Sequence, residues 1–199
     1  YMVQNIIKVN DAKYSLIEKI DKDINFKTCK ILDPCLGTGN LLLEIFENLI
    51  KKYQECNNQD LKEIIKQIYS RQLYGFDIDQ SVVNLAKFIF IIKAIELCPS
   101  YLDDDNLVVP NFVCIQTPNI KRSRLHEVNV LIETMKDASL IGSLLRVPNY
   151  DYFTLLQSVT CKEEKEIIEL AILLNMKYDI VITNPPYMGR KVLPNIILN

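Results

Sequence analysis

The sequence is poor in the residue patterns that hold metal ions. Its 199 residues contain no tryptophan and one histidine, His126, and no two of its six cysteines have C-x-x-C spacing. Structural zinc sites usually combine closely spaced cysteines and histidines. We therefore expect no zinc site, and we interpret the cysteines as reduced thiols of a cytoplasmic protein.

The sequence also lacks long apolar runs, and no secretory signal is visible in it. An apolar run such as residues 88–92 is bounded by Lys87 and Lys93, whereas a membrane helix needs about 20 apolar residues. The first residues, Tyr1-Met2-Val3, lead into a polar mixture and not into an apolar signal segment. We therefore expect no association with a membrane.

There is no excess of basic charge. The chain has 23 Lys and Arg against 25 Asp and Glu, a net charge of −2, whereas free-standing nucleic-acid binders are usually basic. Any contact with nucleic acid must therefore be local or be supplied elsewhere. Lys121-Arg122-Ser123-Arg124 and Arg190-Lys191 could touch phosphates, although a solvated charged face is the more ordinary interpretation.

What is present is an alternation of short apolar runs with amphipathic stretches, which is typical of a mostly parallel α/β sheet with helices on both faces. We expect one domain over residues 1–199, with its last strand at an open edge. The helix near 81–97 is apolar nearly all round, which predicts that it is well buried. The predicted strands are 29–32, 73–76, 111–116 and 179–183, and the predicted helices are 1–9, 11–23, 41–53, 59–70, 81–97, 127–138 and 162–174.

The loop from Asp33 to Gly39 joins the first predicted strand to a strong helix. Its glycines permit a tight turn and a close approach of a ligand to the backbone. A P-loop requires Lys where Asn40 stands, and a dinucleotide fingerprint requires Gly or Ala where Leu42 stands. The acid Asp33 disfavours a pyrophosphate and suits a cationic amine, as in S-adenosyl-L-methionine. A glycine-rich turn without a ligand is the alternative interpretation.

Two other strand ends carry candidate ligand-binding residues. Asp77 follows the second predicted strand, where an acid typically binds ribose hydroxyls, although by itself it could be a helix cap. Ile78 would flank an adenine ring, and Gln116 or Thr117 could reach the same ring. The last predicted strand leads into Asn184-Pro185-Pro186-Tyr187, whose amide, backbone carbonyl and aromatic ring are suited to holding a planar amine. Such strand ends are where open α/β sheets bind ligands.

These segments, in this order, resemble motifs I, II and IV of the amino-methylating adenine-specific DNA methyltransferases. The segments are Asp33-Pro34-Cys35-Leu36-Gly37-Thr38-Gly39, Phe76-Asp77-Ile78-Asp79 and Asn184-Pro185-Pro186-Tyr187. Tyr1-Met2-Val3 resembles the end of motif X, which precedes motif I in the class with the cofactor half first. Residues 138–144 and Tyr187-Met188-Gly189 are similar to the large phage-defence methylases of the PglX type and to fused restriction–modification enzymes. The start of motif X, the later strands and a target-recognition domain are missing, so the resemblance implies a truncated fragment.

The resemblance implies a Rossmann-like class I methyltransferase fold that binds S-adenosyl-L-methionine. Asp33 would meet the methionine amine and Asp77 would bind the ribose. The remaining cofactor-lining residues would be Pro34, Cys35, Gly37, Gly39, Ile78 and Gln116. No covalent cysteine step is needed in this chemistry.

The resemblance also implies direct in-line transfer of a methyl group to the exocyclic amine of adenine. Asn184 and the Pro185 carbonyl would accept the two amine hydrogens, with Pro186 holding Pro185 extended. Tyr187 would stack on an adenine flipped out of double-stranded DNA. Restriction or phage-defence subunits would be partners, and we expect the fragment alone to be inactive on DNA.

Two alternatives remain open at this point. A protein-glutamine or RNA methylase could use the same Asn184–Tyr187 tip, although such enzymes tend to carry Asp-Leu-Gly where this chain has Asp33-Pro34. A non-catalytic nucleotide-binding or interaction module of the same fold is the other, and the intact Asn184 and Tyr187 argue against it.

Overall fold

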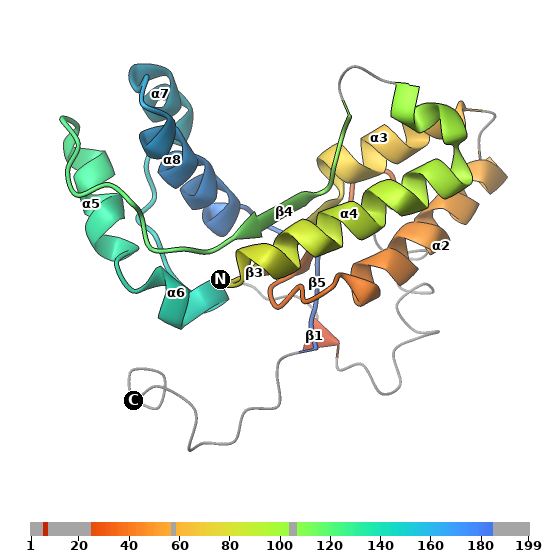
Figure 1. Cartoon of the computed structure of the whole chain (residues 1–199), viewed down its shortest axis with the longest axis horizontal. Coiled ribbons are helices and arrows are strands. Elements are labelled where there is room, and N and C mark those ends of the chain that lie inside the picture. Colours follow the sequence, from red (N-terminus) through yellow and green to blue (C-terminus); the bar gives the residue numbers. More distant parts are fainter. Residues whose placement is uncertain (1–5, 8–24, 57–58, 104–106, 185–199) are drawn as a thin grey trace. The chain divides into compact units, whose positions relative to one another are not determined.

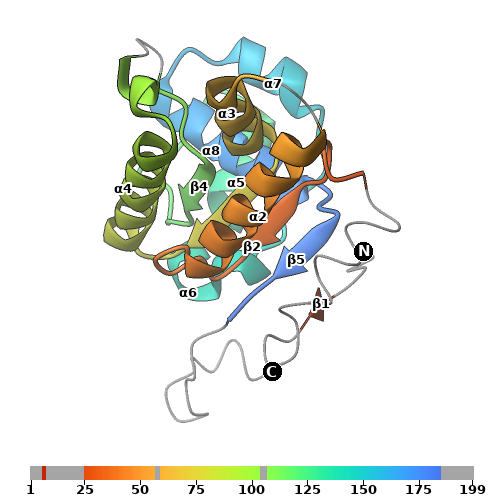
Figure 2. The ribbon, with the colours of Figure 1, turned by 90° about the vertical axis from the view of Figure 1, so that its right-hand side faces the viewer.

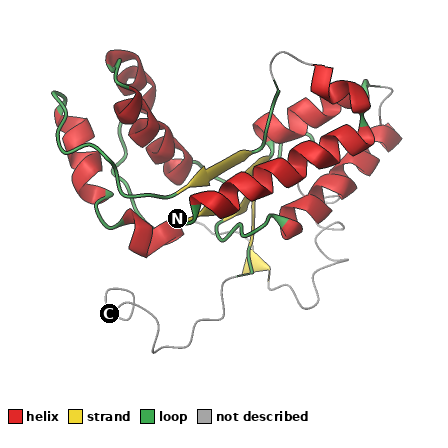
Figure 3. Ribbon diagram, viewed as in Figure 1, coloured by secondary structure: helices red, strands yellow, loops and turns green. Residues whose placement is uncertain are grey.

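A computed structural model describes residues 6–7, 25–56, 59–103 and 107–184. These residues form two compact units (Figure 1). The first comprises the described residues up to Val113 together with residues 178–184, and the second comprises Cys114–Lys177. From residue 31 on, one or more helices separate each strand from the next (Figure 3), as the sequence pattern predicts.

The first unit is built on a five-stranded sheet with the order β1-β5-β2-β3-β4. The central strand β2 pairs in parallel with β5 on one side and with β3 on the other, so that Ile31 lies opposite both Ile180 and Leu73. This confirms the predicted α/β class with a parallel sheet. The strands are β1 (Ile6–Ile7), β2 (Ile31–Asp33), β3 (Leu73–Asp77), β4 (Asn111–Cys114) and β5 (Ile180–Ile182).

Two predictions about the sheet were wrong. The helix predicted for residues 1–9 is replaced at Ile6–Ile7 by strand β1, which pairs in parallel with β5. Strand β5 therefore lies between β1 and β2 and not at an open edge (Figure 2). Its consecutive β-branched residues, Ile180 to Ile182, are the pattern of an inner parallel strand. The helix predicted for residues 11–23 lies outside the described residues.

The helices of the first unit join through a cluster of buried aromatic rings. Phe46 of α2 (Asn40–Cys56), Tyr69 of α3 (Leu61–Arg71) and Phe90 of α4 (Gln80–Leu97) have ring centroids 4.9 to 5.9 Å apart. The Tyr69 hydroxyl donates a 2.7 Å hydrogen bond to the Phe90 carbonyl oxygen, and burial raises the pKa of this tyrosine. Burying each ring stabilises the fold by roughly 1.5–3 kcal/mol. A short 3₁₀ helix, Pro99–Asp103, follows α4.

Helix α4 is only half covered, which corrects the prediction that it is well buried. Its buried side chains form one stripe, Val83, Ala86, Phe90 and Ala94. On another face Leu85, Phe88 and Ile92 are 46%, 58% and 49% exposed. An apolar residue on a helix is buried only where a neighbouring element packs against that face, and the sequence pattern does not specify which faces have neighbours.

The second unit is helical. It contains α5 (His126–Thr134), α6 (Ala138–Ile141), the 3₁₀ helix Gly142–Leu144, α7 (Tyr152–Ser158) and α8 (Lys162–Asn175). Its core includes Val128 and Leu131 from α5 and Ile168 and Ala171 from α8. The Asn175 side chain donates to the Pro148 carbonyl oxygen at 2.9 Å and to the Tyr152 hydroxyl at 3.1 Å, which ties the end of α8 to the start of α7.

The helix predicted for residues 127–138 is interrupted. Helix α5 ends at Thr134, whose hydroxyl donates a 2.7 Å hydrogen bond back to the Val130 carbonyl oxygen. Such a bond competes with the helical backbone pattern. Within the described part of the chain, none of the helices has the length and apolar character needed to cross a membrane.

Candidate cofactor and catalytic site

Three polar strand ends meet at one edge of the parallel sheet. Asp33 ends β2 and lies in register with Gly75 of β3. Asp77, two residues after Gly75, ends the neighbouring strand. Leu32 lies in register with Val181 of β5, which brings Thr183 to the other side of Asp33. Parallel strands direct all their carboxyl ends to the same edge. The prediction that these strand ends form a common site is therefore consistent with the topology of the first unit.

The loop after β2 is held in a tight turn. The Leu36 amide donates to the Phe76 carbonyl oxygen at 2.8 Å, and the Gly39 amide donates to the Leu36 carbonyl oxygen at 2.9 Å. Gly37 and Gly39 have φ angles of 53° and 80°, which L-residues with a side chain adopt only with strain. A Cβ atom on Gly37 would meet no atom within 4 Å, whereas one on Gly39 would lie 3.1 Å from the Phe90 ring. Gly37 thus faces open space and Gly39 is packed against α4.

The Asp77 carboxylate connects this loop to the end of β3. Its Oδ2 atom accepts a hydrogen bond from the Gly37 amide at 2.9 Å, and its Oδ1 atom accepts one from the Asp79 amide at 3.1 Å. The cap of α4 is a different residue, Asp79, whose Oδ1 atom accepts from the Ser81 amide at 2.8 Å. The alternative interpretation of Asp77 as a helix cap is therefore wrong.

Asp33 is buried beside the loop, with 1% of its surface exposed. Its Oδ1 atom accepts a hydrogen bond from the Cys35 amide at 3.0 Å. The pKa of the Asp33 carboxyl is raised from 3.8 to about 6. Burial is the main cause of the rise and the nearby Asp77 charge adds to it, whereas the Cys35 amide and the Thr183 hydroxyl lower the pKa. An ionised Asp33 is therefore poorly compensated by the protein itself, and a cation beside it would stabilise it.

Sequence analysis missed Thr183. Its Oγ1 atom is buried and makes no well-formed hydrogen bond with the described residues, although it is close enough to Asp33 and Cys35 to lower the pKa of both groups. A buried polar atom without a partner costs about 1–3 kcal/mol. The signal in the sequence was the change from Ile182 to a hydroxyl residue directly before Asn184.

Sequence analysis also missed Gly75. A Cβ atom at this position of β3 would lie 2.7 Å from a Leu36 methyl group and 2.9 Å from the Phe112 ring. The absence of a side chain at Gly75 thus allows Leu36 to seat the loop against the sheet. A glycine inside an otherwise apolar strand is a known sign of such a close approach.

The other predicted site residues are placed as follows. Pro34 and Cys35 are partly exposed in the loop, Asn184 is exposed directly after Thr183, and Ile78, directly after Asp77, is 52% exposed. Gln116 belongs to the second unit, so its role toward the adenine stays a prediction. Pro185, Pro186 and Tyr187 lie outside the described residues, and their roles also stay predictions.

The described residues fit a ligand that has a cationic amine and a ribose. One edge of the sheet combines a buried carboxyl with a raised pKa, open space in front of Gly37, and a Thr183 hydroxyl that makes no well-formed hydrogen bond with the described residues. The Asp77 carboxylate has lone pairs beyond the two used by backbone amides. S-adenosyl-L-methionine carries a cationic amine, a sulfonium and ribose hydroxyls that match these groups.

Comparisons with known proteins point to the same chemistry. Residues 71–196 match the sequence profile of a family described as Eco57I restriction-modification methylase. The chain is 22% identical over 245 aligned positions to the adenine-specific methyltransferase BrxX of Escherichia coli O9:H4 (strain HS), which covers 96% of this chain and 20% of that protein. It is 23% identical over 194 positions to the adenine-specific methyltransferase PglX of Lacticaseibacillus casei (strain Zhang), covering 83% of this chain and 16% of that protein. The chain spans a fifth or less of the length of these relatives.

Proposed function

The chain belongs to the Eco57I restriction-modification methylase family, and we propose that it transfers a methyl group from S-adenosyl-L-methionine to the exocyclic amine of adenine in DNA. The observation that carries this proposal is the meeting of Asp33, Asp77 and Thr183 at one sheet edge, directly before Asn184. This edge combines groups suited to a cofactor with the start of a tip suited to a planar amine. Both relatives are adenine-specific methyltransferases, which favours adenine over glutamine as the acceptor.

In this proposal the cofactor side of the site is formed by the two loops of the first unit. The ionised Asp33 carboxylate binds the methionine amine, and Gly37 lets the cofactor approach the backbone closely. Asp77 binds the ribose hydroxyls while it continues to hold the Gly37 amide. Ile78 flanks the adenine ring with its exposed side chain. Pro34, Cys35 and Gly39 complete the cofactor-binding set of the first unit. The role of Gln116 toward the adenine ring stays a prediction from the sequence.

The acceptor side is formed by Asn184, Pro185, Pro186 and Tyr187. The bound cofactor supplies an electrophilic methyl group. The Asn184 amide oxygen and the Pro185 carbonyl accept the two hydrogens of the target amine, which orients its nitrogen toward that methyl group. Tyr187 stacks on an adenine flipped out of the duplex. The amine nitrogen would bond to the methyl carbon as the carbon–sulfur bond breaks, so that a neutral thioether leaves, and the nitrogen would release one proton to water. Positioning alone can contribute about 7–11 kcal/mol to such a reaction.

We further propose that this reaction serves a restriction–modification or phage-defence system, with double-stranded DNA and other subunits of that system as partners in the cytoplasm. The family name supports the restriction–modification role. A chain of net charge −2 has little general affinity for DNA, so its DNA contacts must be concentrated in a few places.

Calorimetric titration of S-adenosyl-L-methionine into the chain tests the cofactor site. We expect saturable binding that Asp77→Ala weakens at least about tenfold, the equivalent of losing 1.4 kcal/mol. Asp79→Asn is the matched control, because it removes the same charge two residues away and keeps the cap of α4. Equal affinity of the Asp77→Ala variant and the original chain, or equal losses in both variants, would contradict the proposed site.

A further inference from the structure

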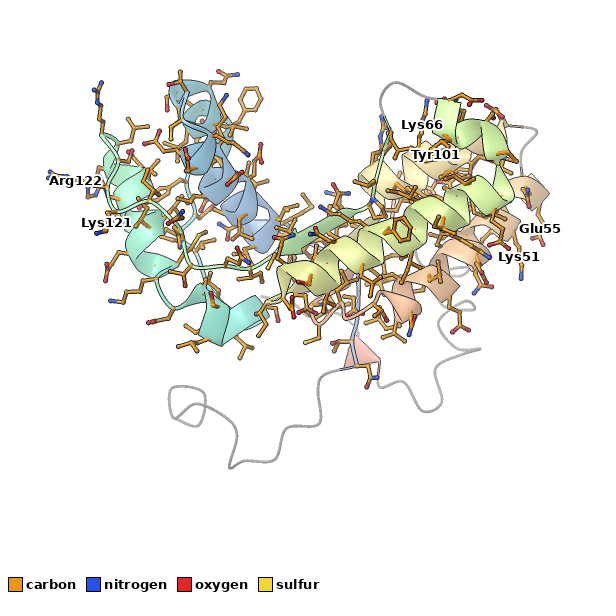
Figure 4. All side chains as sticks on the ribbon, viewed as in Figure 1. Lys51, Glu55, Lys66, Tyr101, Lys121 and Arg122 are labelled. Carbon is orange, nitrogen blue, oxygen red and sulfur yellow. The ribbon has the colours of Figure 1, made fainter. Side chains whose placement is uncertain are left out.

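A short basic segment of the second unit lies at the surface and is held in place by hydrogen bonds. Residues 121–124, here called the basic loop, carry Lys121, Arg122 and Arg124, all exposed, around Ser123, which is only 8% exposed. Lys121 and Arg122 project outward from the ribbon ahead of α5 (Figure 4). The three cations form no ion pair with another described residue. Their charges are therefore available to an outside partner.

The basic loop is fixed by hydrogen bonds to its buried serine. The Ser123 amide donates to Asn129 Oδ1 at 2.8 Å, and Asn129 Nδ2 donates back to the Ser123 carbonyl oxygen at 2.9 Å. The Ser123 hydroxyl accepts from the Leu125 amide at 3.1 Å and donates to the Glu164 carboxylate. The backbone between the two arginines is thus connected to both α5 and α8. A solvated charged face requires no such anchoring.

The sequence that leads into and through the basic loop carries no negative charge. Residues 107–126 contain no Asp or Glu. Glu127 follows in the first turn of α5, and Glu164, the acid that contacts the loop, is occupied by the Ser123 hydroxyl. In a chain of net charge −2, this is a concentrated positive site. Such sites bind polyanions locally even where the whole protein is acidic.

We propose that the basic loop, residues 121–124, is a preorganised contact for the sugar–phosphate backbone of double-stranded DNA. This inference rests on the proposed function, because a DNA substrate is what supplies the phosphates. Arginine guanidinium groups bind phosphate oxygens in a bidentate way, and Lys121 adds a third charge. The Ser123 anchor reduces the conformational entropy that is lost on binding. Phosphate contacts of this kind orient a protein on the duplex and do not read its sequence.

The decisive experiment compares two triple variants that lose the same charge. The loop variant is Lys121→Gln, Arg122→Gln and Arg124→Gln, and the control is Lys51→Gln, Arg71→Gln and Lys177→Gln, which are exposed positions outside α5 and α8. Binding of a short, fluorescently labelled DNA duplex of mixed sequence is measured by anisotropy over a range of salt concentrations. The loop variant should lose roughly tenfold or more in affinity, and the slope of log affinity against log salt should fall by roughly 2 to 3. The control should change both values much less.

Several outcomes would overturn the proposal. Equal losses in the two triple variants would mean that only net charge matters, and an absence of salt-dependent binding by the original chain would mean that the loop is no DNA contact. If the loop variant instead loses binding to vesicles of phosphatidylglycerol but keeps its affinity for DNA, the partner class is wrong. Thermal unfolding of each variant by circular dichroism checks that the fold is retained.

A further variant tests the anchor separately from the charge. Ser123→Ala should lower the DNA affinity and leave the salt slope unchanged, and an unchanged affinity would contradict the preorganisation. Titration with S-adenosyl-L-methionine distinguishes the two proposals. The loop variant should keep cofactor binding, and Asp77→Ala should keep loop-dependent DNA binding. Loop-dependent DNA binding without any cofactor binding would reject the proposed function alone.

Discussion

The Asp77 carboxylate accepts a hydrogen bond from the Gly37 amide, with an Oδ2 to N distance of 2.9 Å, and so joins the ends of β2 and β3. The two residues are separated by 40 positions in the sequence. The same carboxylate accepts from the Asp79 amide, so one side chain organises both loops that are proposed to hold the cofactor. Its position therefore affects the shape of the site before any ligand binds.

Replacing Asp77 by alanine should destabilise the chain as well as weaken cofactor binding. The substitution leaves the Gly37 and Asp79 amides without their acceptor, and losing hydrogen bonds to a charged group costs about 1.5–3 kcal/mol. Urea unfolding measures this loss. Amide hydrogen exchange at Gly37 should accelerate in the variant, and unchanged protection there would show that the bond is not formed in solution.

The two glycines of the loop should respond differently to alanine. Gly39→Ala adds a methyl group 3.1 Å from the buried Phe90 ring at a φ angle of 80°, so it should cost about 2–4 kcal/mol of unfolding free energy. Gly37→Ala meets no atom within 4 Å and should cost only about 1 kcal/mol through backbone strain. Urea denaturation of both variants measures the two losses of unfolding free energy. A larger loss for Gly37→Ala than for Gly39→Ala would contradict the described packing.

Cofactor affinity should respond to these two variants in the opposite order. Relative to its loss of stability, Gly37→Ala should lose more affinity than Gly39→Ala. The added methyl group of Gly37→Ala would occupy the open space in front of the loop, where the proposed cofactor approaches the backbone. Its affinity for S-adenosyl-L-methionine should therefore fall by more than its small stability loss explains. Calorimetry at a temperature where both variants remain folded provides the measurement.

The buried Asp33 should make the stability of the chain depend on pH. Its pKa is raised from 3.8 to about 6, so the stabilisation from the neutral carboxyl is complete below pH 3.8 and is lost as the pH rises through about 6. Asp33→Asn keeps an acceptor for the Cys35 amide and cannot ionise. This variant should therefore gain stability relative to the original chain as the pH rises, by up to about 3 kcal/mol above pH 7.

Cofactor binding should show the opposite preference. A cationic amine favours the ionised Asp33, so the affinity for S-adenosyl-L-methionine should rise as the pH increases through about 6. The Asp33→Asn variant should bind weakly at every pH. Calorimetry between pH 5 and 8, combined with unfolding at the same pH values, checks both trends. A flat profile of the original chain would contradict the assignment of Asp33 to the amine.

The positions of Asp33 and Asp77 could be predicted from the sequence because local signals mark them. Short apolar runs precede both acids, and glycine or a capping acid follows them. In a parallel sheet such strand ends share one edge, so the topology alone brings the two acids together. The same reasoning predicted the last strand at residues 179–183, within one residue at each end of the observed Ile180–Ile182.

Other features depend on contacts between distant segments, which a local pattern does not contain. Gly75 is required by Leu36 and Phe112, and the importance of Thr183 follows from the burial of its hydroxyl oxygen near Asp33. Helix α7 was missed because it is short and its signal is a single cap, the Asp151 side chain that accepts from the Thr154 amide. Strand β1 has only two residues and is defined by its pairing with β5.

Helix α4 offers the clearest test of the difference between an apolar residue and a buried one. Phe88 and Phe90 are two positions apart, but Phe88 is 58% exposed whereas Phe90 is fully buried against Phe46, Tyr69 and Phe112. Phe90→Ala should therefore cost about 3–5 kcal/mol of unfolding free energy, and Phe88→Ala should stay within about 0.5 kcal/mol of the original chain. Urea unfolding of both variants measures the difference. Similar large losses at both positions would mean that α4 is covered on both faces in solution, for example by self-association, which light scattering on the same samples would detect.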